Sequence, residues 1–397
     1  MNILTIPLLA GGNSHLIPAF VIHRRYIKNY KKINNYFLIP KSKHNVFNDQ
    51  HIKYLNIDYK ILNEDLKGKG NLKAAEKILH MESEAFSIIK PKVIIEDCTL
   101  SSIFIAEKNN VPRISIYRTG FFRSIPNDLR NKNHMHSLEK GFSKIKKADF
   151  STFFTKEFPD LSIQENINHI NLQKNYLNPK TKLIPGIPSI EVLPDDIQNR
   201  GSYFYTGPLL VQDNPSDKLK QELSNFLGSV SKEKKVFITT GTVDSTDISP
   251  LIDILLKKGY IVISTQKHKA LDELSSRFYY NPFLPLNYLC SQVDLVIHQC
   301  GSGMYHYPIL NEKPTITIGT QCYDREDIAQ RLQLLGVSKH TPHKNDDKNY
   351  LDVFKSHLLD FENASLCDFD KLKELKSETY ETMLSFDMAK VIEFTLS

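Results

Sequence analysis

The sequence predicts an α/β protein made of two β/α/β domains, each with a mainly parallel sheet. Short apolar runs alternate with amphipathic helical stretches along the chain, which is typical of buried parallel strands connected by helices. The alternation restarts near Ser202, and a length of 397 residues suits two domains of ordinary size. These observations favour two α/β domains of similar size.

The first half supplies the elements of one domain. We expect strands over residues 3–9, 36–40, 93–96 and 113–117. We expect helices over residues 16–29, 72–89 and 101–109. The stretch 150–200 is less regular and rich in Asn and Pro, and the polar segment 211–217 is interpreted as a linker between the domains.

The second half repeats the alternation. We expect strands over residues 235–239, 260–265, 295–298 and 314–319. We expect helices over residues 217–227, 250–258, 269–276, 303–311 and 325–335, and a helical tail over 369–396. The predicted parts are an N-terminal domain of residues 1–201, a C-terminal domain of residues 202–375, and a last helix, 376–397, that packs back toward the first domain.

The composition is that of a globular protein, with 41% hydrophobic and 24% charged residues. No run approaches the ~20 apolar residues of a membrane span, and we recognise no signal peptide. The five cysteines are odd in number and never in C-x-x-C spacing, so we expect a cytoplasmic protein without disulfides or structural zinc. Basic clusters at 23–32 and 140–147 are interpreted as solvated helix faces; the alternative is attraction to an acidic lipid surface or a phosphorylated substrate.

Glycines and polar residues follow several of the predicted strands. Ligands of open parallel sheets bind beyond the carboxyl ends of the strands. Residues at those ends are Gly11–His15, Glu96-Asp97, Gly241-Thr242 and His298–Gly303. We therefore expect the site in a cleft between the two domains.

Two of these turns indicate a diphosphate. Gly301, Ser302 and Gly303 stand between a strand and a helix, where free backbone N–H groups and the helix dipole favour an anion. Gly241 and Thr242 form a second such turn, although either turn alone also fits a plain β-to-α connection. Neither half has a G-x-G-x-x-G dinucleotide fingerprint or a Walker loop.

The second half resembles the nucleotide-sugar-binding domain of family 1 glycosyltransferases, which have the GT-B fold and include antibiotic and macrolide glycosyltransferases. The resemblance covers most of residues 202–340 and rests on T-G-P-L, F-I-T-T-G-T, Q-C-G-S-G-M, Pro314 and the pair Asp324-Arg325. It implies two Rossmann-like domains facing across a cleft. It also implies a UDP- or dTDP-sugar donor bound by the second domain.

Some positions depart from the family pattern. The histidine that contacts the diphosphate aligns with Gln299, and His298 lies one place earlier, so either residue is a candidate for that contact. An inward-facing strand residue is the alternative role for His298. The ribose-binding glutamate aligns with Tyr307, and the sugar-binding glutamine aligns with Arg325. Asp324 remains available for sugar hydroxyls, with a helix N-cap as its alternative role.

The first half resembles the same family more loosely. G-G-N-S-H-L-I-P is similar to a G-H-x-x-P turn, which implies that His15 is the base that activates the acceptor. P-K-V-I-I-E-D is similar to the strand whose last aspartate, here Asp97, orients that base. Glu96 is the alternative partner, but neighbouring strand residues face opposite sides, so only one of the two can face His15. A solvated residue at a helix start is the alternative role for His15.

These residues fit transfer of a sugar to a hydroxyl group. A histidine near neutral pH can take the acceptor proton, and a carboxylate fixes its tautomer. The Gly301–Gly303 turn, with Thr242, would stabilise the departing diphosphate. Because no D-x-D-like cluster is present, we expect a metal-independent reaction without a cofactor, and in-line displacement would invert the anomeric centre.

The leading prediction is therefore an inverting hexosyltransferase that acts on a small molecule, such as a natural product. One alternative is a lipid-linked acceptor at a membrane face, which the basic clusters favour. Another is a non-catalytic nucleotide-sugar-binding protein, with Gln299, Met304, Tyr307 and Arg325 marking a degenerate donor site. We expect no nucleic-acid partner, peripheral membrane contact at most, and a monomer or a homodimer.

Overall fold

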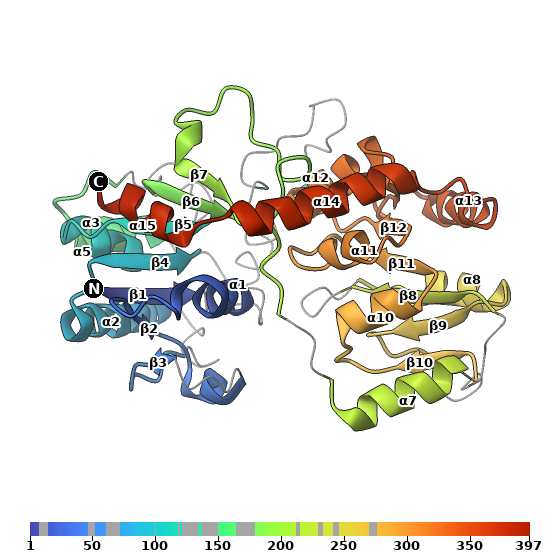
Figure 1. Cartoon of the computed structure of the whole chain (residues 1–397), viewed down its shortest axis with the longest axis horizontal. Helices are drawn as coiled ribbons and strands as arrows, with labels where there is room; N and C mark the ends of the chain where they lie inside the picture. Colours follow the sequence, from blue (N-terminus) through green and yellow to red (C-terminus); the bar gives the residue numbers. More distant parts are fainter. Residues whose placement is uncertain are drawn as a thin grey trace. The chain divides into compact units, whose positions relative to one another are not determined.

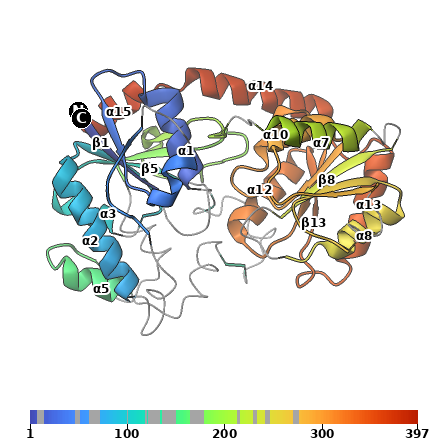
Figure 2. The same cartoon turned by 90° about the horizontal axis from the view of Figure 1, so that it is seen from below.

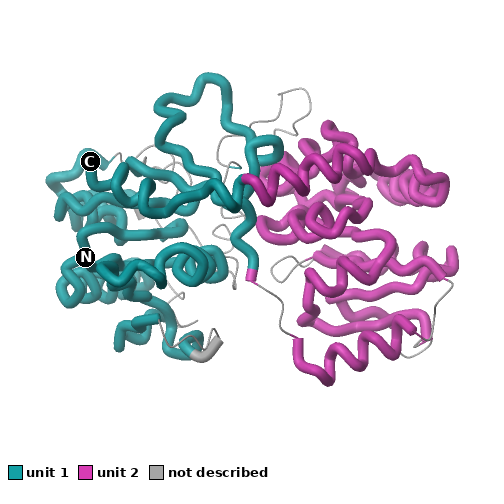
Figure 3. Tube along the Cα trace, in the orientation of Figure 1, with its two compact units in different colours: residues 1–122, 136–210, 382–397 teal, residues 123–135, 211–381 magenta. Residues whose placement is uncertain are grey.

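The computed structural model divides into two compact units (Figure 3). Unit 1 comprises residues 1–122, 136–210 and 382–397, and unit 2 comprises residues 123–135 and 211–381. Within these units, the structure describes residues 1–7, 15–46, 52–60, 72–99, 101–117, 120, 134–135, 150–163, 179–211, 215–228, 233–240, 246–269 and 276–397.

Unit 1 is built on a seven-stranded sheet with the order β3-β2-β1-β4-β5-β6-β7, in which every pairing is parallel (Figure 1). Its strands are β1 (Asn2–Pro7), β2 (Asn34–Phe37), β3 (Lys53–Tyr54), β4 (Val93–Asp97), β5 (Arg113–Ile116), β6 (Thr181–Ile184) and β7 (Tyr203–Tyr205). Its helices are α1 (Leu16–Ile22), continued by the π-helix η1 (His23–Ile27), then η2 (Lys41–Val46), α2 (Leu72–Ile89), α3 (Ser102–Lys108), α5 (Phe150–Glu157) and η6 (Arg200–Ser202).

The main core of unit 1 lies on one face of this sheet, under α2, α3 and α5, which Figures 1 and 2 show together. Leu4, Ile6 and Ile94 point into this core. Because side chains alternate along a strand, residues of the other parity, including Thr5 and Asp97, face the side of α1. The strands that carry the candidate site are thus covered on both faces.

Unit 2 contains a six-stranded parallel sheet with the order β10-β9-β8-β11-β12-β13. Its strands are β8 (Lys235–Thr239), β9 (Ile261–Ser264), β10 (Phe278–Tyr280), β11 (Leu295–His298), β12 (Thr315–Ile318) and β13 (Ser338–Thr341). Its helices are α7 (Asp217–Gly228), α8 (Ser249–Lys257), α10 (Leu286–Gln292), α11 (His306–Leu310), α12 (Tyr323–Leu334), α13 (Tyr350–Glu362) and most of α14 (Phe369–Ser385). A buried core joins α8 and α13 to one face of the sheet.

The last residues of the chain belong to unit 1. Residues 382–397 contain the end of α14 and all of α15 (Met388–Leu396). The hydroxyls of Thr395 and Thr181 are 2.8 Å apart, and the Phe394 ring meets the edge of Phe204 at a centroid distance of 5.4 Å. The C-terminal helix α15 is therefore part of the first unit, covering β6 and β7.

The predicted fold class, two domains with parallel Rossmann-like sheets, is confirmed. Residues 202–210, expected in the second domain, lie in unit 1 because β7 pairs with β6. Strands β3, β6, β7, β10 and β13 and helices α5, α10 and α13 were not expected. The helix expected over 269–276 falls mostly outside the described residues. Within the described chain, no helix is long and apolar enough to cross a membrane.

Candidate active site

Several candidate residues lie where the strand order of each sheet reverses. In unit 1 the order turns between β1 and β4, and in unit 2 it turns between β8 and β11. Crevices at such switch points, outside the carboxyl ends of the strands, are where ligands bind in open α/β sheets. His15 follows β1, Asp97 ends β4, and Gln299 follows β11. Among the described residues, His15, Asp97 and Gln299 therefore lie at the two switch points.

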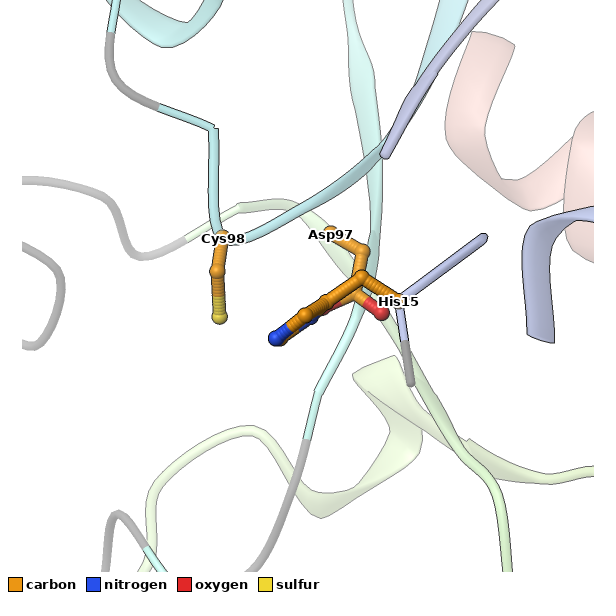
Figure 4. Close-up of side chains that lie close together, drawn as sticks. All are labelled: His15, Asp97 and Cys98. Atoms are coloured by element: carbon orange, nitrogen blue, oxygen red, sulfur yellow. The ribbon is translucent and has the colours of Figure 1, made fainter. Parts of the chain in front are cut away.

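His15 and Asp97 form a buried pair in unit 1 (Figure 4). His15 precedes the first residue of α1, and its Nδ1 lies 2.8 Å from Oδ1 of Asp97. His15 is 7% exposed and Asp97 is fully buried. An ionised carboxylate can only accept a hydrogen bond, so in the neutral form of the ring this contact places the hydrogen on Nδ1 and leaves the lone pair on Nε2. This is the arrangement that a general base requires.

Glu96, the alternative partner, faces the other side of the sheet. Its Oε1 lies 3.7 Å from Nη1 of Arg113. Burial raises the pKa of Glu96, and the neighbouring charge of Arg113 opposes that rise. Because β4 alternates its side chains, only Asp97 reaches His15. The alternation of side chains along β4 therefore determines which of the two carboxylates contacts His15.

Cys98 completes a small cluster with this pair, which sequence reasoning missed. Each of His15, Asp97 and Cys98 offers one possible metal-ligand atom, and these three atoms lie within 4.8 Å of one another. Cys98 is buried and has a positive φ of 54°, a conformation that is uncommon for residues other than glycine. The only sequence signal was its position directly after Asp97.

A second buried group supports the turn between β4 and α3. The carboxylate of Glu82 accepts hydrogen bonds from the hydroxyl of Tyr59 and from Oγ of Ser101, the latter at 2.5 Å. Burial raises the pKa of Glu82 to about 7, although these hydrogen bonds lower it in part. Glu82 lies on the core-facing side of α2. Its position in the helical repeat is that of an apolar core residue, so the sequence did not indicate that it hydrogen-bonds the turn after β4.

In unit 2, His298 shapes the turn that follows β11. Its Nδ1 accepts a hydrogen bond from the backbone N–H of Cys300 at 3.0 Å, and Cys300 has a φ of 50°. His298 is fully buried, and burial lowers its pKa to about 3. Gln299 is also buried, at 2% exposure. The ring of His298 is therefore neutral and engaged in the turn.

The glycine-rich turn differs from the sequence expectation. The helix expected over 303–311 spans only His306–Leu310, and turn residues 302–305 precede it. A Cβ added to Gly301 would meet no described heavy atom within 4 Å. Gly301, Ser302 and Gly303 are partly exposed. The turn thus offers accessible backbone, whereas α11 is too short to supply a strong dipole.

Asp324 and Arg325 lie in the first turn of α12 and are partly exposed. The N-cap of this helix is Cys322, so Asp324 is not the capping residue. Next to them, Oε2 of Glu326 lies 2.9 Å from Nε2 of His340. Burial of Glu326 opposes its charge, but His340 and the N–H of Thr320 outweigh burial and lower its pKa. This contact ties Glu326, in the first turn of α12, to His340 on β13.

The two remaining candidates, Gly241 and Thr242, lie outside the described residues. The strand before them ends at Thr239, whose hydroxyl lies 2.7 Å from that of Thr265. Thr239, His298 and Thr317 occupy paired positions on three neighbouring strands. Paired positions share a face, so these polar side chains form a row at the carboxyl edge of the second sheet.

No protein-family model matches the chain, and no curated protein matches its sequence. Its fold is similar to that of solved glycosyltransferases. The glycotransferase of kitacinnamycin has a TM-score of 0.66 and 13% identity, with 100% of this chain and 99% of that chain covered. UGT71G1 of Medicago truncatula, complexed with UDP-glucose, has a TM-score of 0.72 and 16% identity, with 99% and 98% covered. A UDP-glucose:anthocyanidin 3-O-glucosyltransferase in complex with UDP has a TM-score of 0.65 and 15% identity, with 99% and 98% covered.

These likenesses extend over nearly the whole of each chain. They establish the GT-B fold that the sequence resemblance implied, with two Rossmann-like domains. At 13–16% identity they establish the fold alone.

Proposed function

We propose that this protein is an inverting glycosyltransferase that moves a hexose from a UDP- or dTDP-sugar to a hydroxyl group of a small molecule. The observation that carries the proposal is the buried His15–Asp97 pair, at 2.8 Å, at the switch point of the first sheet. It occurs in a chain whose whole length has the fold of nucleotide-sugar-dependent transferases.

The His15–Asp97 pair would act as the base. The acceptor oxygen attacks the anomeric carbon while its proton passes to Nε2 of His15, and the bond from that carbon to the diphosphate oxygen breaks. The electron pair of that bond leaves with the diphosphate. Asp97 holds the ring in the required tautomer and stabilises the imidazolium. Attack opposite the leaving group inverts the anomeric centre.

The donor would be held by unit 2. Its accessible turn at Gly301–Gly303 offers backbone N–H groups to the diphosphate, and Asp324 and Arg325 stand at the partly exposed start of α12. We assign the diphosphate contact to this turn, because the ring of His298 is fully buried and neutral. The proposal needs neither a metal ion nor a cofactor, since the backbone N–H groups of this turn would stabilise the charge on the leaving group.

A nucleotide-sugar screen tests this function. The protein is incubated with UDP-, dTDP- and GDP-sugars, and slow hydrolysis of each donor is measured alongside thermal unfolding with each nucleotide. We expect stabilisation by UDP or dTDP, and hydrolysis that the His15→Ala variant slows. If no nucleotide stabilises the protein, the transferase is rejected in favour of a protein that does not use nucleotide sugars.

A second candidate is a transferase with a lipid-linked acceptor. One surface of unit 1, where η1 meets the end of α14, carries an open hollow of about 450 Å³ lined by Arg25, Tyr30, Leu384 and Lys390, among others. Leu384 is 86% exposed, and Tyr30 is 37% exposed. Cations beside exposed apolar groups suit an anionic membrane surface. Flotation with anionic vesicles would favour this candidate, and protein that stays unbound would reject it.

A further inference from the structure

We propose that His15, Asp97 and Cys98 also form a binding site for a borderline-soft divalent metal ion, foremost Zn²⁺. Occupation of this site would switch off the base that the proposed function assigns to His15. Binding of the ion depends only on the three side chains, whereas its inhibitory effect rests on the proposed function.

The three side chains supply the ligand types that zinc prefers. They are an imidazole, a carboxylate and a thiol, and Cys98 is not part of a disulfide. Their ligand atoms lie within 4.8 Å of one another, and all three residues are buried. Bond lengths to zinc place neighbouring ligand atoms roughly 3.3–3.8 Å apart. Closing the site with water as a fourth ligand therefore requires the ligand atoms to approach one another by about 1.5 Å at most.

Local backbone conformation explains why two consecutive residues serve one site. Along a regular strand, neighbours point to opposite faces, as Glu96 and Asp97 do. The strand ends at Asp97, and the positive φ of Cys98 redirects the chain at that point. Figure 4 shows the side chain of Cys98 directed toward the same space as the ring of His15 and the carboxylate of Asp97. If the strand had continued regularly, the thiol of Cys98 would have pointed to the face opposite Asp97. The change of direction at Cys98 instead brings it close to His15 and Asp97.

The chemistry of the set selects among metal ions. On binding, the thiol of Cys98 loses its proton to solvent, and the thiolate and the carboxylate together balance the charge of a divalent ion. Magnesium and calcium require oxygen ligands and do not match a thiolate and an imidazole. We therefore expect Zn²⁺ and Co²⁺ to bind and Mg²⁺ to leave the site unaffected. A metal ion bound to Nδ1 beside Asp97 would take the place of the Nδ1 hydrogen, the neutral ring would carry its hydrogen on Nε2 instead, and Nε2 could not accept a proton.

Cobalt provides a direct probe of the site in the purified full-length protein. Titration with Co²⁺ should give a thiolate-to-cobalt charge-transfer band, which Zn²⁺ abolishes and Mg²⁺ does not. The Cys98→Ser variant should lose the band. The matched control is Cys367→Ser, which removes a half-buried thiol in unit 2 and should keep it. A band that persists in Cys98→Ser would overturn the proposal.

X-ray absorption on the unaltered protein covers the case in which Cys98→Ser does not fold. With Zn²⁺ bound, we expect one sulfur scatterer at about 2.3 Å and nitrogen or oxygen scatterers at about 2.0–2.1 Å. A shell of nitrogen and oxygen alone would reject the site. Inhibition of sugar transfer by Zn²⁺, reversed by a chelator, tests the second half of the proposal. A cobalt band in a protein without transferase activity would support the metal site and reject only the proposed function.

Discussion

Asp97 accepts a hydrogen bond from His15 at 2.8 Å, although 82 residues separate them in the chain. They meet because β1 and β4 are neighbours in the sheet, with Pro7 paired to Asp97. Strand β1 ends at Pro7, and His15 directly precedes α1. The geometry of the pair is thus set by strand pairing on one side and by the start of a helix on the other.

Replacing His15 by alanine should lower the rate of sugar transfer by roughly a hundredfold or more, because the acceptor loses its base. Binding of UDP or dTDP should be unchanged, since the proposed donor residues belong to unit 2. Transfer rate and nucleotide-dependent thermal shift are measured on the same preparation. Near-normal transfer by the variant would remove His15 from the mechanism.

Replacing Asp97 by asparagine should reduce kcat by about 10²–10⁴, because an amide neither enforces the tautomer nor stabilises an imidazolium. The substrate KM should change little. Glu96→Gln is the matched control, since it alters the adjacent carboxylate on the opposite face of β4. We expect that variant to lose stability through Arg113 and to retain transfer. Equal loss of kcat in both variants would contradict a specific role for Asp97.

Glu82 should make the stability of the protein depend on pH. Its pKa is about 7 in the folded protein, against an ordinary value of 4.5. Between these values the folded state binds a proton that the unfolded chain has released, so the free energy of unfolding falls as pH rises, by about 3 kcal/mol at most. Urea unfolding at pH 5 and pH 8 measures this difference. Glu82→Gln should reduce it, and an unchanged slope would show that Glu82 is not its source.

His298 should matter for the fold of the turn more than for nucleotide binding. His298→Phe leaves the N–H of Cys300 without its acceptor and should cost about 1–3 kcal/mol in unfolding free energy. His298→Asn offers an amide oxygen in place of Nδ1 and should recover part of that loss. Nucleotide-dependent stabilisation should persist in His298→Asn. If a folded His298→Asn variant were no longer stabilised by nucleotide, the diphosphate contact would have to be assigned to the His298 ring.

Much of the fold was predictable because buried parallel strands are continuous apolar runs. β8 and β11 were expected with the bounds that the structure gives, and α2 likewise. Short strands such as β3 and β7 were not predicted, because a strand of two or three residues shows no periodic pattern of apolar residues. The sequence also did not indicate which strands the C-terminal helix α15 covers. Its partners on β6 and β7 are distant in sequence and are determined by tertiary contacts.

The candidate site was predictable where a side chain stands at a strand end, as His15 and Asp97 do. It was not predictable where the role depends on conformation. Cys98 joins the pair through a positive φ, and His298 is fully buried and accepts a hydrogen bond within its own turn. Glu82 follows an apolar helical spacing, so only its contacts with Tyr59 and Ser101 distinguish it from the core.

The inclusion of residues 382–397 in unit 1 bears on the order in which the protein is assembled during synthesis. A chain extended through residue 381 already holds all of unit 2. It still lacks the segment that places Thr395 against Thr181 and Phe394 against Phe204. Unit 1 therefore begins first on the ribosome and is finished last, with β6 and β7 left without α15 until the whole of unit 2 has been made.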